Sequence, residues 1–210
     1  FGIQPEIVPF QQSDSNTENH GVGALVIRRP WPGMARTIYG DPERFKQVYL
    51  SPHPGMYYAG DGASKDTHGN YRIHGRIDDV INVSAHRVAT AEVEGALTRH
   101  PACSEAAVLG KPDDITGESI VAFCLLKSST TTDQQDRHAL EKELKELVRN
   151  TVGPIATPKH IYFPSDLPKT RSGKIMRRVL RKLIVGEREL GDLSTLTNPD
   201  VVEEIRSILQ

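Results

Sequence analysis

A run of basic side chains between residues 168 and 178 has the composition of an anion-binding segment. It reads Pro-Lys-Thr-Arg-Ser-Gly-Lys-Ile-Met-Arg-Arg, with Lys174 near its centre. Ser172 is a residue type that caps helix amino termini, so the spacing predicts Lys174 in the first turn of a helix. Unpaired backbone N–H groups and the helix dipole favour an anion there, and a lysine adds a mobile positive charge. The segment is therefore a candidate site for phosphate or carboxylate chemistry.

Three interpretations of this segment are open from its composition: a solvated helix face, a nucleic-acid-binding surface, and phosphate chemistry. The predicted helix has an apolar face opposite a basic face formed by Arg177, Arg178, Arg181 and Lys182. We expect the apolar side of the helix to pack against the rest of the protein and its basic side to remain exposed to solvent. A Walker A phosphate loop is excluded, because it needs Gly where this chain has Pro168 and Ser or Thr where it has Ile175.

Composition places the chain among globular proteins of one or two domains. The 210 residues are 37% hydrophobic and 25% charged, with 26 basic and 27 acidic side chains. The net charge of −1 gives no global attraction to nucleic acid or to an anionic membrane. Cys103 and Cys124 have no metal-type spacing and are expected to be core thiols. With no targeting signal or long apolar span in the sequence, we expect a reducing compartment, either cytoplasmic or nuclear and cytoplasmic.

The first part of the chain has the patterns of a strand-rich region. Alternating or apolar runs predict strands near residues 2–8, 23–29, 57–61 and 71–76, and a polar loop is expected at 11–16. Asp41 and Pro42 predict a short capped helix. Asp66, His68, Gly69 and Asn70 predict a hairpin turn between the last two strands.

After Arg76 the pattern changes, which predicts a domain boundary near Asp78. We expect a small hairpin around Ser84-Ala85-His86, a helix capped by Thr90, and a polar loop from Ser128 to Asp136. The apolar run 120–126 is typical of a strand covered on both faces. Further elements are predicted as strands at 106–110 and 160–163, a helix through 140–148 that ends before Pro154, and a last helix from Asn198. The predicted fold class is α+β.

The combination of segments resembles a known family, the AMP-forming acetyl-CoA synthetases of the adenylate-forming acyl-CoA synthetase superfamily. The similarity lies in four ordered segments and covers nearly the whole chain. These segments are Tyr58-Ala59-Gly60-Asp61, the run from Gly75 to Arg87, Thr90-Ala91-Glu92-Val93-Glu94, and Pro168 to Lys174. Each segment is a weak signal alone, and together they are specific. Trp31-Pro32-Gly33-Met34-Ala35-Arg36-Thr37 points to the acetyl-activating branch.

This resemblance implies a division of the chain into two parts. Residues 1–77 would be the carboxyl-terminal end of the large adenylate-forming domain, a β-rich tail. Residues 78–210 would be a small mobile carboxyl-terminal domain with a short central β-sheet flanked by helices. The chain starts at Phe1, so we expect a piece of a longer protein that lacks the phosphate loop, adenine pocket and acyl pocket. These residues alone are expected to be inactive, and they leave the acyl-chain preference open.

The chemistry that the resemblance implies has two steps. Acetate and ATP, with Mg²⁺, give acetyl-AMP and pyrophosphate, and the thiol of CoA then displaces AMP. Lys174 matches the catalytic lysine of the first step, where its ammonium would neutralise charge that builds as acetate meets the α-phosphate. The family also switches this lysine off by reversible acetylation, which implies an acetyltransferase and a deacetylase as partners.

The resemblance also assigns nucleotide and hinge residues. Asp61 would bind the ribose hydroxyls through two carboxylate oxygens. Arg76 would contact ribose and phosphate, and Arg87 the nucleotide phosphate. Asp78 aligns with the hinge about which the small domain swings between the two steps. Without the resemblance, each of the charged side chains in these motifs would be interpreted as part of a surface salt bridge.

The same comparison predicts CoA and cation contacts. Ser84 and Ala85 would line the pantetheine tunnel, although the family usually has Gly where this chain has Ala85, a departure that puts CoA affinity in question. Arg149 would meet a CoA phosphate, or else it is a cation at a helix carboxyl terminus. A structural cation would be held near Thr98, His100 and Cys103 through main-chain oxygens.

Two alternatives of other classes stay open from the sequence. A nucleic-acid-binding module would explain the basic residues from Lys169 to Lys182. A regulatory domain with a vestigial adenylate site would have the same fold without nucleotide-linked behaviour.

Overall fold

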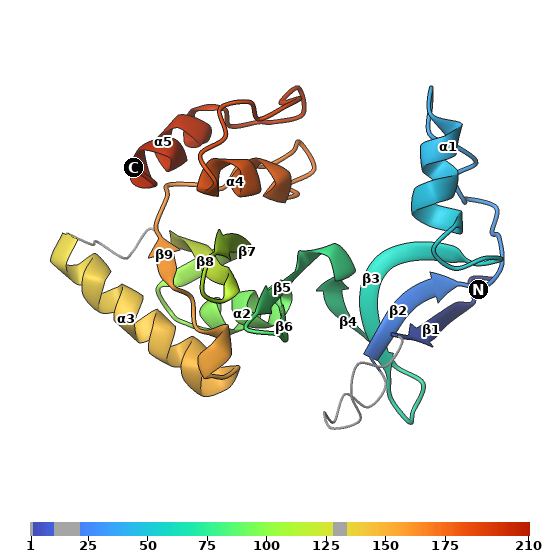
Figure 1. Ribbon diagram of the computed structural model, residues 1–210, viewed down its shortest axis with the longest axis horizontal. Coiled ribbons are helices and arrows are strands. Elements are labelled where there is room, and N and C mark those ends of the chain that lie inside the picture. Colours follow the sequence, from blue (N-terminus) through green and yellow to red (C-terminus); the bar gives the residue numbers. More distant parts are fainter. Residues whose placement is uncertain (1, 11–21, 128–133) are drawn as a thin grey trace. The chain divides into compact units, whose positions relative to one another are not determined.

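The computed structural model describes residues 2–10, 22–127 and 134–210 (Figure 1). The chain forms two compact units, Phe1–Asp78 and Asp79–Gln210. Each unit has its own β-sheet with helices packed on it. This mixed architecture confirms the predicted α+β class. No helix within the described ranges is long and apolar enough to cross a membrane.

The first unit is built on a four-stranded antiparallel sheet whose strand order follows the chain. Its strands are β1 (Pro5–Pro9), β2 (Val22–Ile27), β3 (Tyr57–Lys65) and β4 (Tyr71–Arg76). The predicted turn between β3 and β4 is confirmed, because Asp66 accepts hydrogen bonds from the backbone N–H groups of His68 and Asn70 at 2.9 and 2.8 Å. The loop predicted at 11–16 lies outside the described residues.

A short helical segment packs against this sheet through aromatic side chains. It consists of α1 (Pro42–Phe45) and the π-helical turn η1 (Lys46–Leu50). The predicted cap is confirmed, since Asp41 accepts the N–H of Arg44 at 3.0 Å. Tyr49 of η1 stacks on Tyr57 of β3 with ring centroids 5.3 Å apart.

The second unit has a five-stranded sheet centred on one long hairpin. The hairpin strands are β7 (Cys103–Asp113) and β8 (Gly117–Leu126). Along the other edge of β8 lie the short hairpin β5 (Val80–Val83) and β6 (His86–Ala89), and the parallel strand β9 (His160–Tyr162). The 3₁₀ turns η2 (Ile77–Asp79) and η3 (Pro154–Ala156) lead into β5 and β9.

Helices cover both faces of this sheet, as the apolar run 120–126 predicted. One face packs against α2 (Thr90–Leu97) and α3 (Gln134–Thr151), and the other against α4 (Arg177–Ile184) and α5 (Asp200–Ile208), as Figure 1 shows. Alternate residues of β8 enter the two cores: Ile120, Ala122 and Cys124 face the first, and Val121, Phe123 and Leu125 the second. Two buried faces explain why the strand is continuously apolar.

Two predicted helix starts in this unit are wrong, and one loop is shorter than predicted. Thr90 is the first residue of α2 and is buried, while the cap position belongs to Ala89, which is still paired with Val80 in the sheet. The loop predicted from Ser128 to Asp136 is helical from Gln134, and its earlier part lies outside the described residues. The other wrong start is at Ser172, because α4 begins only at Arg177.

Candidate functional site

Asp61 and Arg76 lie opposite each other on β3 and β4. They are direct partners in the antiparallel register, with Arg76 Nη1 3.8 Å from Asp61 Oδ1. The same nitrogen donates to the carbonyl of Ala59 at 3.0 Å. Gly60 has a φ of +78°, and a Cβ there would come within 2.8 Å of the Arg76 guanidinium. Glycine at this position therefore allows the close approach of the Arg76 guanidinium to the β3 backbone.

Arg76 also holds the residue predicted to be the hinge. Its Nε donates to Asp78 Oδ1 at 3.0 Å, so one guanidinium contacts both Asp61 and Asp78. The side chains of Asp61 and Asp78 remain 32% and 65% exposed. Both carboxylates are therefore within reach of a ligand.

Ser84 and Ala85 form the tight turn of the β5–β6 hairpin, as predicted. Both have positive φ, +48° and +68°, which is the left-handed conformation of a type I′ turn. The N–H of Ser84 donates to the carbonyl of Thr116 at 2.9 Å, which ties the turn to the β7–β8 loop. Arg87 follows on β6 opposite Asn82 and is exposed. The hairpin thus places Ser84, Ala85 and Arg87 within four residues at one edge of the sheet.

Lys174 is not in a helix, which corrects the prediction from Ser172. Lys169 pairs with Ile175 in an antiparallel bridge, and α4 begins only at Arg177. The N–H of Thr170 donates to the carbonyl of Lys174 at 2.9 Å, and the turn is closed by Gly173 at a φ of +80°. Backbone donors that would be free at a helix start are consumed in this small hairpin, so Lys174 contributes its ammonium rather than a helix amino terminus.

The ammonium of Lys174 is available to a ligand. The residue is exposed, and no hydrogen bond or ion pair joins its Nζ to any residue that the structure describes. Its backbone N–H donates to the hydroxyl of Thr170 at 3.2 Å, so the main chain is fixed while the side chain is not.

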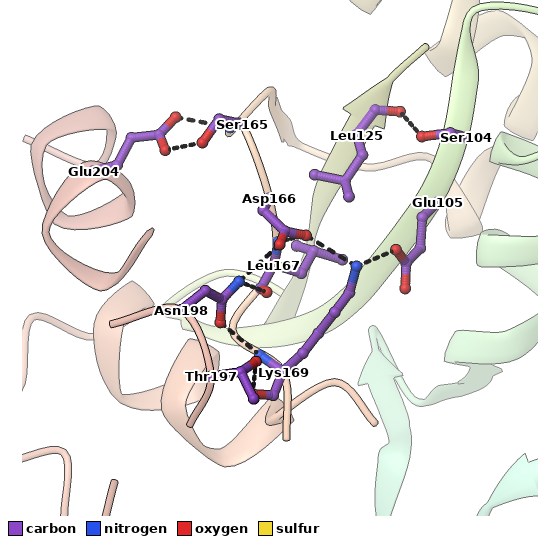
Figure 2. A network of polar contacts seen from close by, with 10 residues as sticks. All are labelled: Ser104, Glu105, Leu125, Ser165, Asp166, Leu167, Lys169, Thr197, Asn198 and Glu204. Atoms are coloured by element: carbon purple, nitrogen blue, oxygen red, sulfur yellow. Dashed lines mark hydrogen bonds and ion pairs between the residues drawn. The ribbon is translucent and has the colours of Figure 1, made fainter. Parts of the chain in front are cut away.

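The base of the 168–176 hairpin is anchored by a polar network, shown in Figure 2. Lys169 Nζ lies 2.7 Å from Glu105 and 2.9 Å from Asp166, and the Glu105 hydrogen bond raises the pKa of Lys169. Asn198 donates to Asp166 and to the carbonyl of Leu167, each at 2.8 Å, and accepts the N–H of Lys169 at 3.2 Å. The two lysines of this hairpin therefore differ: Lys169 is structural and Lys174 is exposed.

The basic face of α4 is only partly solvated, because its cations also make contacts within the unit. Arg178 donates to the carbonyl of Leu190 at 2.8 Å, and Lys182 to that of Glu189 at 2.8 Å. Arg177 and Arg181 both reach the buried carboxylate of Asp79. These cations stabilise a loop and a buried acid. Their contacts disfavour two interpretations of the basic segment, as a purely solvated helix face and as a nucleic-acid-binding surface.

Arg177 belongs to an acid–base cluster that sequence reasoning missed. Its Nη2 lies 2.7 Å from Glu94 Oε1, and its Nη1 donates to the carbonyl of Val108 at 3.1 Å. Glu94 also accepts the N–H of Val108 at 2.8 Å, and burial raises the pKa of Glu94 more than Arg177 lowers it. The available signal was the i, i+4 spacing of Arg177 and Arg181, which places both on one helix face.

The remaining predicted residues are Arg149, Thr98, His100 and Cys103. Arg149 is exposed in the last turn of α3. Thr98 donates to the carbonyl of Glu94, His100 accepts the N–H of Ala102, and Cys103 is buried in the core. The described residues contain no group of three or more His, Cys, Asp or Glu side chains that could hold a metal ion.

Comparison with known proteins finds similarity to a family model and to longer relatives. Residues 92–174 match the model of the AMP-binding enzyme C-terminal domain. The chain is 50% identical over 207 residues to an acetyl-coenzyme A synthetase of Coprinopsis cinerea, and 52% identical over 206 residues to one of Syntrophobacter fumaroxidans. Each alignment covers 98% of this chain and 31% of the relative. The chain thus spans about a third of the length of the curated relatives it matches.

Solved structures share the fold. The amide bond synthetase McbA from Marinactinospora thermotolerans is 29% identical, with a TM-score of 0.69 over 86% of this chain and 34% of that chain. The anthranilate CoA ligase AuaEII in complex with anthranoyl-AMP is also 29% identical, with a TM-score of 0.69 over 86% of this chain and 33% of that chain. An acetoacetyl-CoA synthetase from Streptomyces lividans, 23% identical, matches in fold over 99% of this chain and 30% of that chain, with a TM-score of 0.77.

Proposed function

Because residues 92–174 match the model of the AMP-binding enzyme C-terminal domain, we propose that this chain works as part of an AMP-forming acetate–CoA ligase. Acetate and ATP give acetyl-AMP and pyrophosphate in the first step. The CoA thiol then attacks the acetyl carbonyl and releases AMP. The observation that carries this proposal is the 50% identity to acetyl-coenzyme A synthetases over 98% of the chain.

Lys174 is proposed as the catalytic residue of the first step. Attack of a carboxylate on the α-phosphate brings two anions together and increases negative charge on the phosphate oxygens. An ammonium without a partner of its own can stabilise that charge at no cost in broken ion pairs. The exposed side chain and the fixed backbone of Lys174 support this role.

Asp61, Arg76 and Arg87 are proposed to hold the nucleotide. A carboxylate can accept hydrogen bonds from both ribose hydroxyls, and the exposed oxygens of Asp61 fit that task. Arg76 lies beside Asp61 and offers a planar cationic fork to ribose or phosphate oxygens. Arg87 would reach the nucleotide phosphate.

CoA is proposed to approach the turn of the β5–β6 hairpin. Ser84 and Ala85 would line the path of the pantetheine arm, and Arg149 would bind a CoA phosphate. Asp78 would be the hinge that brings either Lys174 or this turn to the nucleotide. Residues 1–77 would belong to the large domain and 78–210 to the mobile one.

The proposal includes two metal cations, Mg²⁺ and a structural cation. The described residues offer no cluster of acidic side chains for Mg²⁺, so we expect it to enter with the ATP phosphates. A structural cation near Thr98, His100 and Cys103 would use main-chain oxygens. We further propose that Lys174 is acetylated and deacetylated by partner enzymes, and that the protein is either cytoplasmic or nuclear and cytoplasmic.

The direct test uses a complete enzyme that contains this chain. Without CoA, labelled pyrophosphate should exchange into ATP only when acetate is present; addition of CoA should yield acetyl-CoA and AMP. Absence of acetate-dependent exchange would contradict the proposal and favour a regulatory domain. A salt-sensitive shift of nucleic acid on a gel would instead favour a binding module.

A further inference from the structure

Two successive carboxylates at the boundary between the compact units bind to different units. Asp78 accepts a hydrogen bond from Arg76 of the first unit at 3.0 Å. Asp79 is only 9% exposed and is held by Arg177 and Arg181 of α4 in the second unit. The polypeptide is therefore fixed by a side chain on each side of the bond that joins Asp78 to Asp79.

The contacts of Asp79 form a balanced and largely buried cluster. Arg177 Nε lies 3.5 Å from Asp79 Oδ2, and Arg181 contacts Asp79 Oδ1. Arg177 continues to Glu94 at 2.7 Å, and Glu94 accepts the N–H of Val108. Two acids and two bases thus join the start of the unit to α2, β7 and α4. Because desolvation offsets much of the attraction in a buried ion cluster, we expect this one to fix a geometry rather than to add much stability.

The same cluster lies next to the segment that carries Lys174. Arg177 is the first residue of α4 and follows the hairpin directly. The N–H of Met176 donates to the carbonyl of Pro168 at 2.7 Å, so the hairpin and the first turn of α4 share a continuous hydrogen-bonded path. A movement of α4 relative to Asp79 would consequently move Lys174.

We propose that Asp79 is a positioning residue for Lys174, acting through Arg177 and Arg181. The cluster makes the Lys174 hairpin follow any rotation of the chain at Asp78 as one body. This inference rests on the proposed function, since it concerns the position of the Lys174 ammonium during adenylation. Thioester formation does not need Lys174 at the phosphate, and it should tolerate a loosened cluster.

The test compares the two half-reactions in a complete enzyme that contains this chain. The readout is the rate of acetate-dependent pyrophosphate exchange divided by the rate of acetyl-CoA formation from supplied acetyl-AMP. Asp79→Asn should lower this ratio at least about tenfold, because small misplacements of a catalytic group have large effects on rate. Arg181→Gln alone should also lower this ratio. In the double variant with Asp79→Asn, the Arg181→Gln change should lower the ratio by less than about a further twofold, because both residues act through the same contact.

The control is Arg206→Gln, which removes an arginine from an exposed pair with Glu203 on α5 and should leave the ratio unchanged. A folded Asp79→Asn enzyme with an unchanged ratio would overturn the inference, provided that Lys174→Ala lowers the ratio. An unchanged ratio in Lys174→Ala would instead refute the proposed function. If Asp79→Asn does not fold, Arg181→Gln alone, with its side chain 42% exposed, decides by the same criterion.

Discussion

At the scale of single residues, the chemistry of this chain depends on which charges have partners. Lys169 and Lys174 lie five positions apart in one hairpin, yet Lys169 is held by Glu105 and Asp166 while Lys174 has no such contact among the described residues. The sequence predicted the importance of Lys174 but not this difference. Asp166 lies three positions before Lys169, but Glu105 is distant in the sequence, so local spacing contains no information about the Glu105 contact.

Ala85 is expected to be a source of backbone strain. An L-residue at a φ of +68° is disfavoured, and the second central position of a type I′ turn usually has glycine. We predict that Ala85→Gly raises the free energy of unfolding by about 0.5–1 kcal/mol, measured by urea denaturation. Ala91→Gly, in helix α2 where φ is negative, is the matched control and should lower it by about 1 kcal/mol. Equal destabilisation by both changes would argue against strain at Ala85.

Asp113 gives the chain a predictable loss of stability in acid. Its carboxylate lies 2.7 Å from Lys159 and accepts the N–H groups of Ile115 and Thr116, and these bonds, Lys159 foremost, lower its pKa from 3.8. Because the pKa is lower in the folded state, this stabilisation is present above about pH 4 and is lost as the pH falls further.

The measurement is the free energy of unfolding as a function of pH. Below about pH 4, the Asp113→Asn variant should lose stability less steeply than the unmodified chain. Asp114→Asn is the control, because the Asp114 side chain makes no hydrogen bond or ion pair with the described residues. Parallel curves for the unmodified chain and Asp113→Asn would show that Asp113 does not titrate as argued.

At the scale of elements, most strands and helices could be predicted, whereas the segment around Lys174 could not. The apolar runs of β8 and the turn residues before β4 are local signals, and both led to correct elements. The predicted cap at Ser172 failed because Lys169 pairs with Ile175, and Thr197 and Asn198, about 28 residues away, hold the strand. The contacts of the basic face of α4 were missed for the same reason, since Asp79 lies 102 positions before Arg181.

The anchoring of the hairpin leads to a test by proteolysis. Asn198→Ala removes three hydrogen bonds at the base of the hairpin, to Asp166, Leu167 and Lys169. We expect the free energy of unfolding to fall by about 1–3 kcal/mol, and trypsin to cleave faster after Arg171 and Lys174. Asn150→Ala, on the exposed side of α3, should change neither. Unchanged cleavage in Asn198→Ala would show that the hairpin is held by its backbone bonds alone.

At the scale of the whole molecule, the chain is two compact units joined between Asp78 and Asp79. The change of pattern after Arg76 predicted a boundary near Asp78, because strand-rich and α+β patterns differ along the sequence. The contacts of Asp79 could not be predicted from the sequence, since Arg181 lies 102 positions further along the chain. Asp61 and Arg76 lie in one unit and Lys174 in the other, so the proposed chemistry uses residues from both units.

The most direct test of this account is the Lys174→Ala variant of a complete enzyme that contains this chain. Acetate-dependent pyrophosphate exchange should fall at least about 100-fold, because the ammonium acts on charge that develops in adenylation. Formation of acetyl-CoA from supplied acetyl-AMP should stay within about threefold of the unmodified enzyme, because that step does not build charge at the α-phosphate. Undiminished exchange in the variant, or an equal loss of both half-reactions, would contradict the role assigned to Lys174.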